Sequence, residues 1–168
     1  MAAETLPFEI HEPTTGLASR CEPILRALPD WFGIESAIVD YVKAIESLPT
    51  LMVTCGEDDI GFLSLKVHGP EAADAYVLGI LEPWHRQGVG RAMFAEGEAW
   101  LATQEIRFLQ VKTVDPTREC KYYAVSRRFY ESIGFTKLET FPTLWDECNP
   151  CLQMIKIVET GLHATQDQ

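Results

Sequence analysis

Hydrophobic residues follow two periods along this chain, and these periods predict where helices and strands form. Apolar positions recur at spacings of three and four after Gly16, after Gly33 and over residues 88–103, which is the spacing of one helix face. A fourth helix is expected over residues 124–133. Gly134 ends it, because glycine readily adopts the left-handed conformation that closes a helix.

Shorter apolar or alternating runs predict seven strands, separated by turn residues. They cover residues 8–11, 51–55, 60–67, 75–81, 108–114, 135–141 and 152–158. The second and third form a hairpin, whereas residues 142–150 are expected to be a loop too long and aromatic for a tight turn. The order β-α-α-β-β-β-α-β-α-β-β combines hairpins with strand-helix-strand units, which predicts an α/β fold with a mixed sheet flanked by helices.

The composition is that of one ordinary globular domain. The 168 residues are 46% hydrophobic and 23% charged, and no internal repeat or linker interrupts them. We therefore expect a single domain over residues 1–159. The polar residues 160–168 are expected to form a mobile tail.

The net charge of the chain limits the kinds of molecule that it is expected to bind. The chain has 14 Lys and Arg against 25 Asp and Glu, a net charge of −11, which argues against nucleic acids and anionic membranes and favours a cationic partner. The N-terminus lacks the basic opening and apolar core of a secretory signal, and the longest apolar run, residues 75–81, is too short to cross a membrane. These features predict a cytoplasmic protein.

Five cysteines, an odd number without a tight framework, indicate free thiols in a reducing compartment. Cys148 and Cys151 form a C-x-x-C motif, which has redox, zinc-binding and purely structural interpretations. A redox motif normally opens a helix after a strand, and a zinc site needs two further ligands nearby. Pro150 and the apolar residues after it predict the start of a strand instead. We interpret the pair as structural thiols and expect no metal.

The segment over residues 76–93 carries the clearest chemistry. A buried strand runs into a turn with Gly88 and Gly90, and the turn opens a helix. The amides at the start of a helix suit a phosphate, and glycine lets the backbone approach that phosphate closely. Arg86 and Arg91 add positive charge beside the turn. We therefore expect an anion-binding loop here.

Two other glycine-rich, phosphate-binding motifs do not fit this loop. A Walker loop requires G-x-x-x-x-G-K-[ST], which the chain lacks, and a dinucleotide fingerprint starting at Gly88 has Met93 in place of its third glycine. One alternative stays open: the glycines only ease a strand-to-helix turn. Pro83 favours a ligand site, because it denies the strand an N–H, so that pairing should fail nearby and leave a gap beside the neighbouring strand.

The loop around Gly88 fits the pattern [QR]-x-x-G-x-[GA] except at its first position, and residues 126–135 fit A-x-x-[LF]-Y-E-x-x-G-F except at theirs. Both patterns resemble motifs of the GNAT superfamily of acyl-CoA-dependent N-acetyltransferases. The departures are His85 in place of Gln or Arg and Ser126 in place of Ala. In addition, Tyr123 stands where many members carry an asparagine that contacts the cofactor.

The resemblance extends from Phe8 to Val158 and implies acetyl-CoA as the cofactor. In the family, the pantetheine arm lies between the fourth and fifth strands, here residues 76–81 and 107–114, which splay around it. The pyrophosphate lies on the loop that follows. The implied cofactor-binding residues are Leu78, Gly79, Ile80, His85, Arg86, Gln87, Gly88, Val89, Gly90 and Arg91.

The resemblance also implies two catalytic residues. Tyr130 aligns with the tyrosine that often protonates the departing thiolate in this family, and its alternative role is packing beside Phe129. Glu82 follows the cofactor strand and is expected to take the proton of the amine, directly or through water. Its alternative is an ordinary solvated strand end.

Other groups complete the expected chemistry. Backbone N–H groups from about Ile80 and Leu81 are expected to hold the thioester oxygen as it gains charge. Asp146 and Glu147 have two interpretations, the lining of a pocket for a cationic acceptor and a solvated acidic loop.

The implied function is transfer of an acetyl group from acetyl-CoA to a primary amine, by direct attack in a ternary complex. The expected acceptor is a cationic small molecule, a lysine side chain or an N-terminal amine. The alternative is a non-catalytic acyl-CoA-binding or interaction module on the same fold. Because dimers are frequent in the family, a homodimer is a further expectation.

Overall fold

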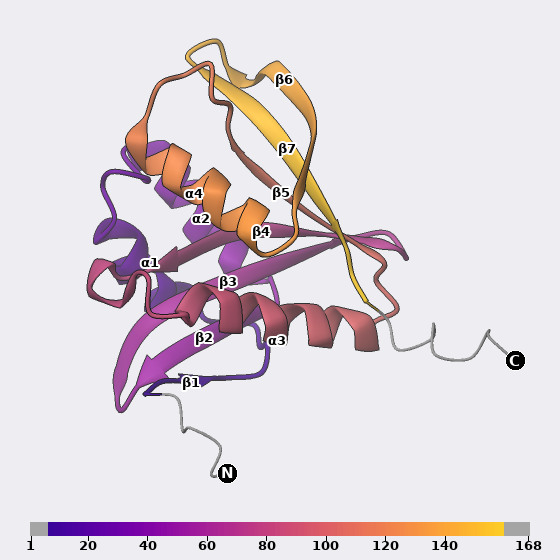
Figure 1. Ribbon diagram of the computed structural model, residues 1–168. Helices are drawn as coiled ribbons and strands as arrows, with labels where there is room; N and C mark the ends of the chain where they lie inside the picture. The colour runs from indigo at the N-terminus through magenta and orange to yellow at the C-terminus, as the bar shows by residue number, and fades with distance from the viewer. Residues whose placement is uncertain (1–6, 160–168) are drawn as a thin grey trace, which may run out of the picture. The chain divides into compact units, whose positions relative to one another are not determined.

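A computed structural model gives the structure of residues 7–159 (Figure 1). The strands are β1 (Glu9–Ile10), β2 (Thr50–Cys55), β3 (Asp58–His68), β4 (Ala72–Ile80), β5 (Phe108–Val114), β6 (Thr136–Asp146) and β7 (Asn149–Ile157). The helices are α1 (Ala18–Arg26), α2 (Glu35–Ile45), α3 (Val89–Thr103) and α4 (Lys121–Ser132), and a short 3-10 helix, η1 (Glu82–Trp84), follows β4. Apart from η1, this is the predicted order.

The seven strands form one hydrogen-bonded sheet in the order β1-β2-β3-β4-β5-β7-β6. β4 and β5 run parallel, and Ala72 and Asp74 pair with Phe108 and Gln110. The pairs β1–β2, β2–β3, β5–β7 and β6–β7 are antiparallel. The sheet is therefore mixed, and the predicted fold class is confirmed.

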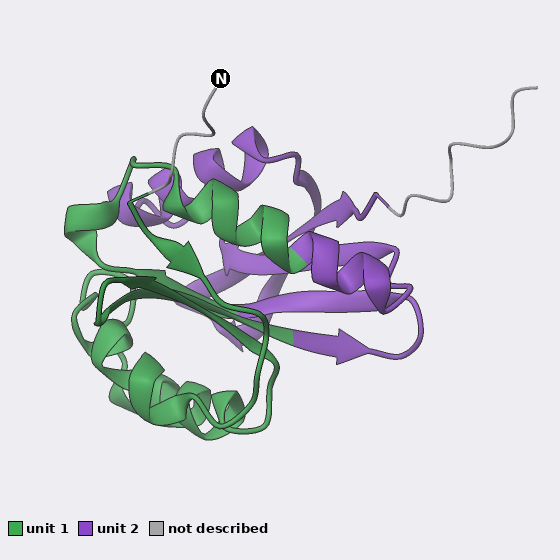
Figure 2. Ribbon diagram, turned by 90° about the horizontal axis from the view of Figure 1, so that it is seen from below, with its two compact units in different colours: residues 1–65, 77–97 green, residues 66–76, 98–168 purple. Residues whose placement is uncertain are grey.

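The chain divides into two compact units, which are described separately (Figure 2). Unit 1 comprises residues 1–65 and 77–97, and unit 2 comprises residues 66–76 and 98–168. The predicted single domain over residues 1–159 stays a prediction. The tail predicted over residues 160–168 lies outside the described residues.

Unit 1 has helices on both faces of its strands (Figure 2). On one face, α1 approaches β4 so closely that a Cβ placed on Gly79 would lie 3.1 Å from side-chain carbons of both Ile24 and Leu28. On the other face, a Cβ on Gly97 of α3 would lie 3.2 Å from Leu63. Glycine at these two positions allows the close helix–sheet packing that forms the core.

Unit 2 packs α4 and the end of α3 against strands β5 and β7 (Figure 1). Leu109 and Val111 of β5 and Met154 of β7 are fully buried. Lys156 of β7 forms an ion pair with Glu98 of α3, with 2.9 Å between Nζ and Oε1. These contacts join one face of the strands to the helices.

The prediction of a long loop over residues 142–150 is wrong, because β6 and β7 extend through these residues and are joined by a tight turn. Asp146 pairs with Asn149, and its carboxylate accepts hydrogen bonds from the backbone N–H of Cys148 at 2.8 Å and from the side chain of Asn149. The strand accommodates Pro142 because β6 is an edge strand with one neighbour, and Pro142 lies between the paired residues Phe141 and Asp146. The register shifts between Phe141 and Asp146 absorb the irregular residues.

Other boundaries also differ from the sequence prediction, two of them by three residues at the start of an element that bears on the site. Helix α4 starts at Lys121 rather than at residue 124, and β4 starts at Ala72 rather than at residue 75. The positive φ of 104° at Gly134 confirms the predicted glycine cap after α4.

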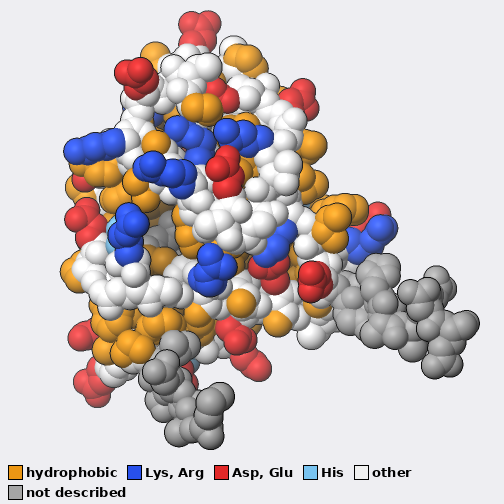
Figure 3. Space-filling model, in the orientation of Figure 1, with side chains coloured by type: hydrophobic (Ala, Val, Ile, Leu, Met, Phe, Trp, Pro, Cys, Tyr) orange, Lys and Arg blue, Asp and Glu red, His pale blue; other side chains and the backbone are white. Residues whose placement is uncertain are grey.

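The surface is not uniformly acidic, although the net charge is −11. Figure 3 shows several Lys and Arg side chains over α4 on the face that it draws. Among the described residues, no helix has the combined length and apolarity that a membrane crossing requires.

Candidate functional site

The segment that follows β4 has the strand-turn-helix form that the sequence predicted. β4 ends at Ile80, and η1, with Pro83 inside it, redirects the chain. The N–H of Leu81 donates to the carbonyl oxygen of Ile60 at 2.9 Å. This N–H is therefore engaged within unit 1, so the expectation that it holds the thioester oxygen is corrected, and the role of Ile80 stays a prediction.

His85 ties the turn to the end of β4. Its Nε2 atom lies 2.6 Å from the carbonyl oxygen of Ile80, and its ring meets the ring of Trp31 edge-on with centroids 5.6 Å apart. Gln87 braces the same turn, because its side-chain amide donates to the carbonyl oxygen of Pro83 at 2.6 Å. Both side chains hold the loop in shape.

The turn contains two residues in the left-handed region. Arg86 has φ of 60° and Gly88 has φ of 82°. A Cβ placed on Gly88 would have no atom within 4 Å, so the space beside it is open. The carbonyl of Gly88 accepts the N–H of Ala92 at 3.1 Å, so the glycine immediately precedes α3, which begins at Val89. Glycine is here because of its backbone conformation.

This geometry fits an anionic ligand such as a pyrophosphate. The first N–H groups of α3 have no carbonyl partner within the helix, and the helix dipole places positive partial charge there. Arg86, Gln87 and Gly88 are exposed, and Val89 and Gly90 are buried at the helix start. The exposed Arg91 follows in the first turn. Unit 1 thus brings the predicted loop residues together.

The three predicted pantetheine-binding residues end β4. Leu78 and Ile80 are half-buried, and Gly79 is buried beneath α1. Glu82, the predicted base, is exposed. It lies in η1 and not at the end of a strand. Its carbonyl oxygen accepts the N–H of His85 at 3.0 Å. Its carboxylate role stays a prediction.

Tyr130 belongs to unit 2, on α4. It is 8% exposed, and its ring centroid lies 5.7 Å from that of Phe129 and 5.8 Å from that of Phe135. These ring contacts fix the side chain, as both a packing residue and a general acid require. The Tyr123 side chain lies on the same helix, and burial raises its pKa.

The C-x-x-C residues lie in the β6–β7 turn and the start of β7, as the predicted strand start requires. Cys148 is exposed and Cys151 is fully buried. Burial raises the pKa of Cys151 to about 11. Asp146 and Glu147 are exposed at the same turn. Within residues 7–159, no three His, Cys, Asp or Glu side chains gather as a metal site.

Sequence reasoning missed a buried carboxylate on β4. Asp74 is 5% exposed and accepts a hydrogen bond from Nζ of Lys112 at 2.7 Å. The side chains of Gln110 and His68 lie 3.5 and 3.8 Å from the same carboxylate oxygen. The signal that could have found it was a charged residue between alanines at the start of an apolar strand.

Sequence reasoning also missed two buried charges where β5 meets α4. Arg127 is 9% exposed and Asp115 is 6% exposed. A basic residue three positions before Tyr130, on the same side of the helix, was the available signal.

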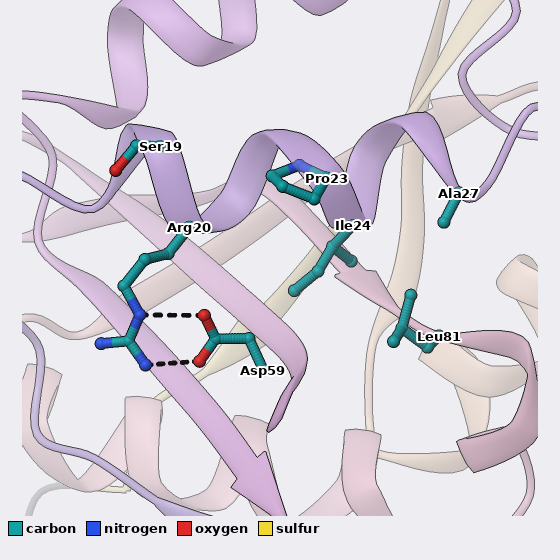
Figure 4. A pocket seen from close by; sticks show the side chains of 7 residues that line it. All are labelled: Ser19, Arg20, Pro23, Ile24, Ala27, Asp59 and Leu81. Atoms are coloured by element: carbon teal, nitrogen blue, oxygen red, sulfur yellow. Dashed lines mark hydrogen bonds and ion pairs between the residues drawn. The ribbon is translucent and has the colours of Figure 1, made fainter. Parts of the chain in front are cut away.

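A cavity of about 370 Å³ lies in unit 1 beside α1 (Figure 4). Ile24 and Leu81 form an apolar part, and Arg20 and Asp59 form a polar part in which two guanidinium nitrogens face the two carboxylate oxygens. Ser19 and Pro23 of α1, and Ala27 directly after this helix, complete the lining. Leu81, which follows the predicted pantetheine-binding residues, lines this cavity, whereas the predicted cofactor-binding and catalytic residues do not.

More than half of the chain matches one known protein family. Residues 48–137, which are 90 of the 168, match the acetyltransferase (GNAT) domain family. The chain belongs to the GNAT acetyltransferase family. The resemblance seen in two sequence motifs is thereby confirmed. No curated protein matches the sequence of this GNAT protein.

Several solved structures share the fold of this chain. A GNAT-family protein from Desulfovibrio desulfuricans has a TM-score of 0.77 at 15% identity, over 90% of this chain and 99% of that chain. The ribosomal-protein-S18-alanine N-acetyltransferase from Escherichia coli has a TM-score of 0.70 at 16% identity, over 90% and 94%. PaiA N-acetyltransferase from Thermoplasma acidophilum, solved in complex with coenzyme A, has a TM-score of 0.68 at 16% identity, over 89% and 98%.

Proposed function

We propose that this GNAT protein transfers an acetyl group from acetyl-CoA to a primary amine. The observation that carries the proposal is the loop before α3, where Gly88 at φ of 82° leaves open space at a helix start. A helix start with an exposed glycine and neighbouring arginines suits a pyrophosphate. Membership of an acetyltransferase family supports the same donor.

The backbone amides from Arg86 to Arg91 would hold the pyrophosphate, whereas the N–H of His85 already donates to the carbonyl oxygen of Glu82. Leu78, Gly79 and Ile80 would pair with the pantetheine arm. Bound acetyl-CoA supplies the activated thioester. His85 serves this arrangement by fixing the turn to Ile80 rather than by chemistry, because its Nε2 atom lies 2.6 Å from the Ile80 carbonyl oxygen. Splaying of β4 from β5 beyond their paired residues is part of the proposal.

The transfer forms an amide C–N bond and breaks the thioester C–S bond. The acceptor must lose a proton before it attacks, because an ammonium at its ordinary pKa of about 10.4 has no lone pair. We assign this proton to Glu82, directly or through water. We assign Tyr130 as the general acid that donates its hydroxyl proton to the departing sulfur.

The acceptor in this proposal is cationic: a polyamine, an amino sugar, a lysine side chain or an N-terminal amine. The net charge of −11 supports this choice, since an acidic protein attracts cations. Cytoplasmic location and a homodimer belong to the same proposal. A panel of charged and neutral amines tests the acceptor class, and equal turnover across the panel would refute it.

Calorimetric titration with acetyl-CoA tests the donor site, on protein that mass spectrometry shows to be free of CoA. We compare Gly88→Glu with Gly88→Ala. Both variants strain the backbone by about 1 kcal/mol at this positive φ, but only glutamate places a carboxylate where the pyrophosphate is proposed. The expected result is loss of binding in Gly88→Glu and retention in Gly88→Ala. Normal binding by folded Gly88→Glu would refute the site.

Turnover separates the enzyme from a non-catalytic acyl-CoA-binding module. Release of free CoA thiol is followed with the amine panel, and any amine-dependent release excludes the non-catalytic alternative. Tyr130→Phe removes the proposed acid and is expected to lower kcat about 100-fold while acetyl-CoA still binds. Unchanged turnover would remove Tyr130 from the mechanism.

A further inference from the structure

Helix α4 buries two of its side chains, Arg127 and Tyr130. They are 9% and 8% exposed. Residues three apart lie one above the other on the same side of a helix, so a shift of one moves the other. The two most buried side chains of α4 are therefore a cation and the proposed general acid.

The guanidinium of Arg127 is anchored on β5. Its Nη1 atom donates to the carbonyl oxygen of Val114, the last residue of β5, at 2.6 Å. Val114 is itself 3% exposed and pairs with Cys151 of β7. This hydrogen bond fixes the middle of α4 against the end of two central strands of unit 2.

Asp115, the next residue, supplies the opposite charge. Its carboxylate accepts hydrogen bonds from the N–H and hydroxyl of Thr117 at 2.9 and 2.8 Å, and from the hydroxyl of Thr140 on β6 at 2.6 Å. Burial by itself raises the pKa of Asp115. These hydrogen bonds and the nearby charge of Arg127 lower the pKa by more than burial raises it, so the pKa lies below its ordinary value. The carboxylate is ionised at neutral pH.

Burying two opposite charges to hold a helix costs free energy of desolvation. Desolvating them offsets most of their attraction, and apolar side chains of similar volume often give equal or higher stability. A charged hydrogen-bonding group fixes orientation better than apolar packing does, because its donors and acceptors must face each other. The arrangement thus favours a role in positioning over a role in stability.

We propose that Arg127, anchored on the Val114 carbonyl beside the Asp115 carboxylate, is a positioning residue that sets the place of the Tyr130 hydroxyl in acetyl transfer. This inference rests on the proposed function, in which Tyr130 is the general acid. Arg127 makes no contact with the reacting atoms in this scheme. It acts by fixing α4.

A double-mutant cycle on the full chain tests the inference. Arg127→Met retains the apolar stem but removes the charge and the donor. This change is expected to lower kcat at least about tenfold, because displacement of a catalytic group by about 1 Å slows the reaction strongly. The KM for acetyl-CoA is expected to stay within about twofold of the value for the natural sequence. In a Tyr130→Phe background, the same change is expected to lower kcat less than about twofold, since there is no acid left to misplace. Equal losses in both backgrounds would overturn the inference.

Two matched variants complete the design. Arg128→Met makes the same change at the next, exposed position of α4 and is expected to leave kcat unaltered. Arg127→Lys restores a charge and one donor and is expected to recover part of the loss. Circular dichroism and thermal unfolding establish that each variant folds. If Arg127→Met does not, Arg127→Lys passes through the same cycle.

The outcomes separate this inference from the proposed function. If the natural sequence shows no amine-dependent turnover, both proposals are wrong. If the natural sequence turns over and Tyr130→Phe does so equally well, acetyl transfer stands, but the acid role of Tyr130 and the positioning role of Arg127 are wrong. If Tyr130→Phe loses turnover but Arg127→Met keeps it, only the positioning role is wrong. Loss in both variants with a non-additive cycle supports both proposals.

Discussion

The Nε2 atom of His85 lies 2.6 Å from the carbonyl oxygen of Ile80, so a loop residue is joined to the strand end five positions earlier. His85→Ala removes this hydrogen bond and the edge contact with Trp31. We expect a loss of about 1 kcal/mol in the free energy of unfolding and weaker acetyl-CoA binding, because the loop is no longer held in shape. Urea unfolding and calorimetry measure the two effects. Weaker binding at unchanged stability would indicate direct ligand contact instead.

Gly79 is predicted to be sensitive to the size of an added side chain, because a Cβ there would lie 3.1 Å from side-chain atoms of Ile24 and Leu28. Gly79→Val is expected to destabilise the protein by about 1–3 kcal/mol through overpacking. Gly79→Ala, the smaller step, is expected to cost less because the neighbouring atoms are side-chain ends. Thermal unfolding of both variants provides the measurement. Equal stability of Gly79→Val and the natural sequence would contradict this packing of α1 on β4.

Lys112 neutralises the carboxylate of Asp74, whose side chain is only 6% exposed. Lys112→Met is expected to destabilise the protein by about 2 kcal/mol. This is less than the roughly 3–5 kcal/mol for a fully buried pair, because 28% of the Lys112 side chain reaches solvent. The double variant with Asp74→Leu should cost less than the two single changes together. Additive costs in denaturant unfolding would show that the two groups do not interact.

Asp115 is predicted to stabilise the protein at neutral pH through its lowered pKa. The pKa of an Asp carboxyl in the unfolded chain is about 3.9. When the pKa in the folded protein is lower, the carboxyl stabilises the fold fully at pH values above the unfolded pKa, and this stabilisation is lost as the pH falls through the folded pKa. Asp115→Asn should therefore be less stable at pH 7, and the difference should shrink below about pH 4. Urea unfolding from pH 7 to pH 3 measures it. A constant difference would disprove the linkage.

The cysteines are predicted to react with a thiol reagent according to their burial. Cys148 is exposed and should react first, and Cys55 and Cys120 are half-buried and should follow. Cys21 and Cys151 are fully buried, and burial raises their pKa to about 12 and about 11, so both should be protected until the protein unfolds. Timed labelling and mass spectrometry identify each thiol. Early labelling of Cys151 would refute its structural role.

Much of the fold could be predicted because periodicity is a local property. The α3 positions predicted to share one face include Val89, Met93 and Leu101, and all three are buried. The turn after β4 was equally predictable. Pro83 cannot continue a strand, and Gly88 supplies the positive φ before a helix.

The misplaced loop over residues 142–150 shows where local patterns stop. Pro142 and a run of polar and aromatic residues indicate a loop when they are considered alone. They lie in a strand because β6 is at the edge of the sheet and β7 offers it a partner. Edge position is a property of the assembled sheet, so no window of sequence contains it.

By itself, the sequence determined the element order, the glycine loop and the family, since each depends on residues close together in the chain. Only the tertiary structure decided which charges are buried and what holds them. Arg127 is buried because the end of β5 gives its guanidinium a carbonyl partner, and Asp115 because Thr140 of β6 reaches it. The hydrogen bond of His85 likewise depends on the fold of its own turn, because that turn directs the imidazole back to the carbonyl oxygen of Ile80. Burial of a polar group requires a partner, and that partner is distant in sequence or defined only by the folded backbone.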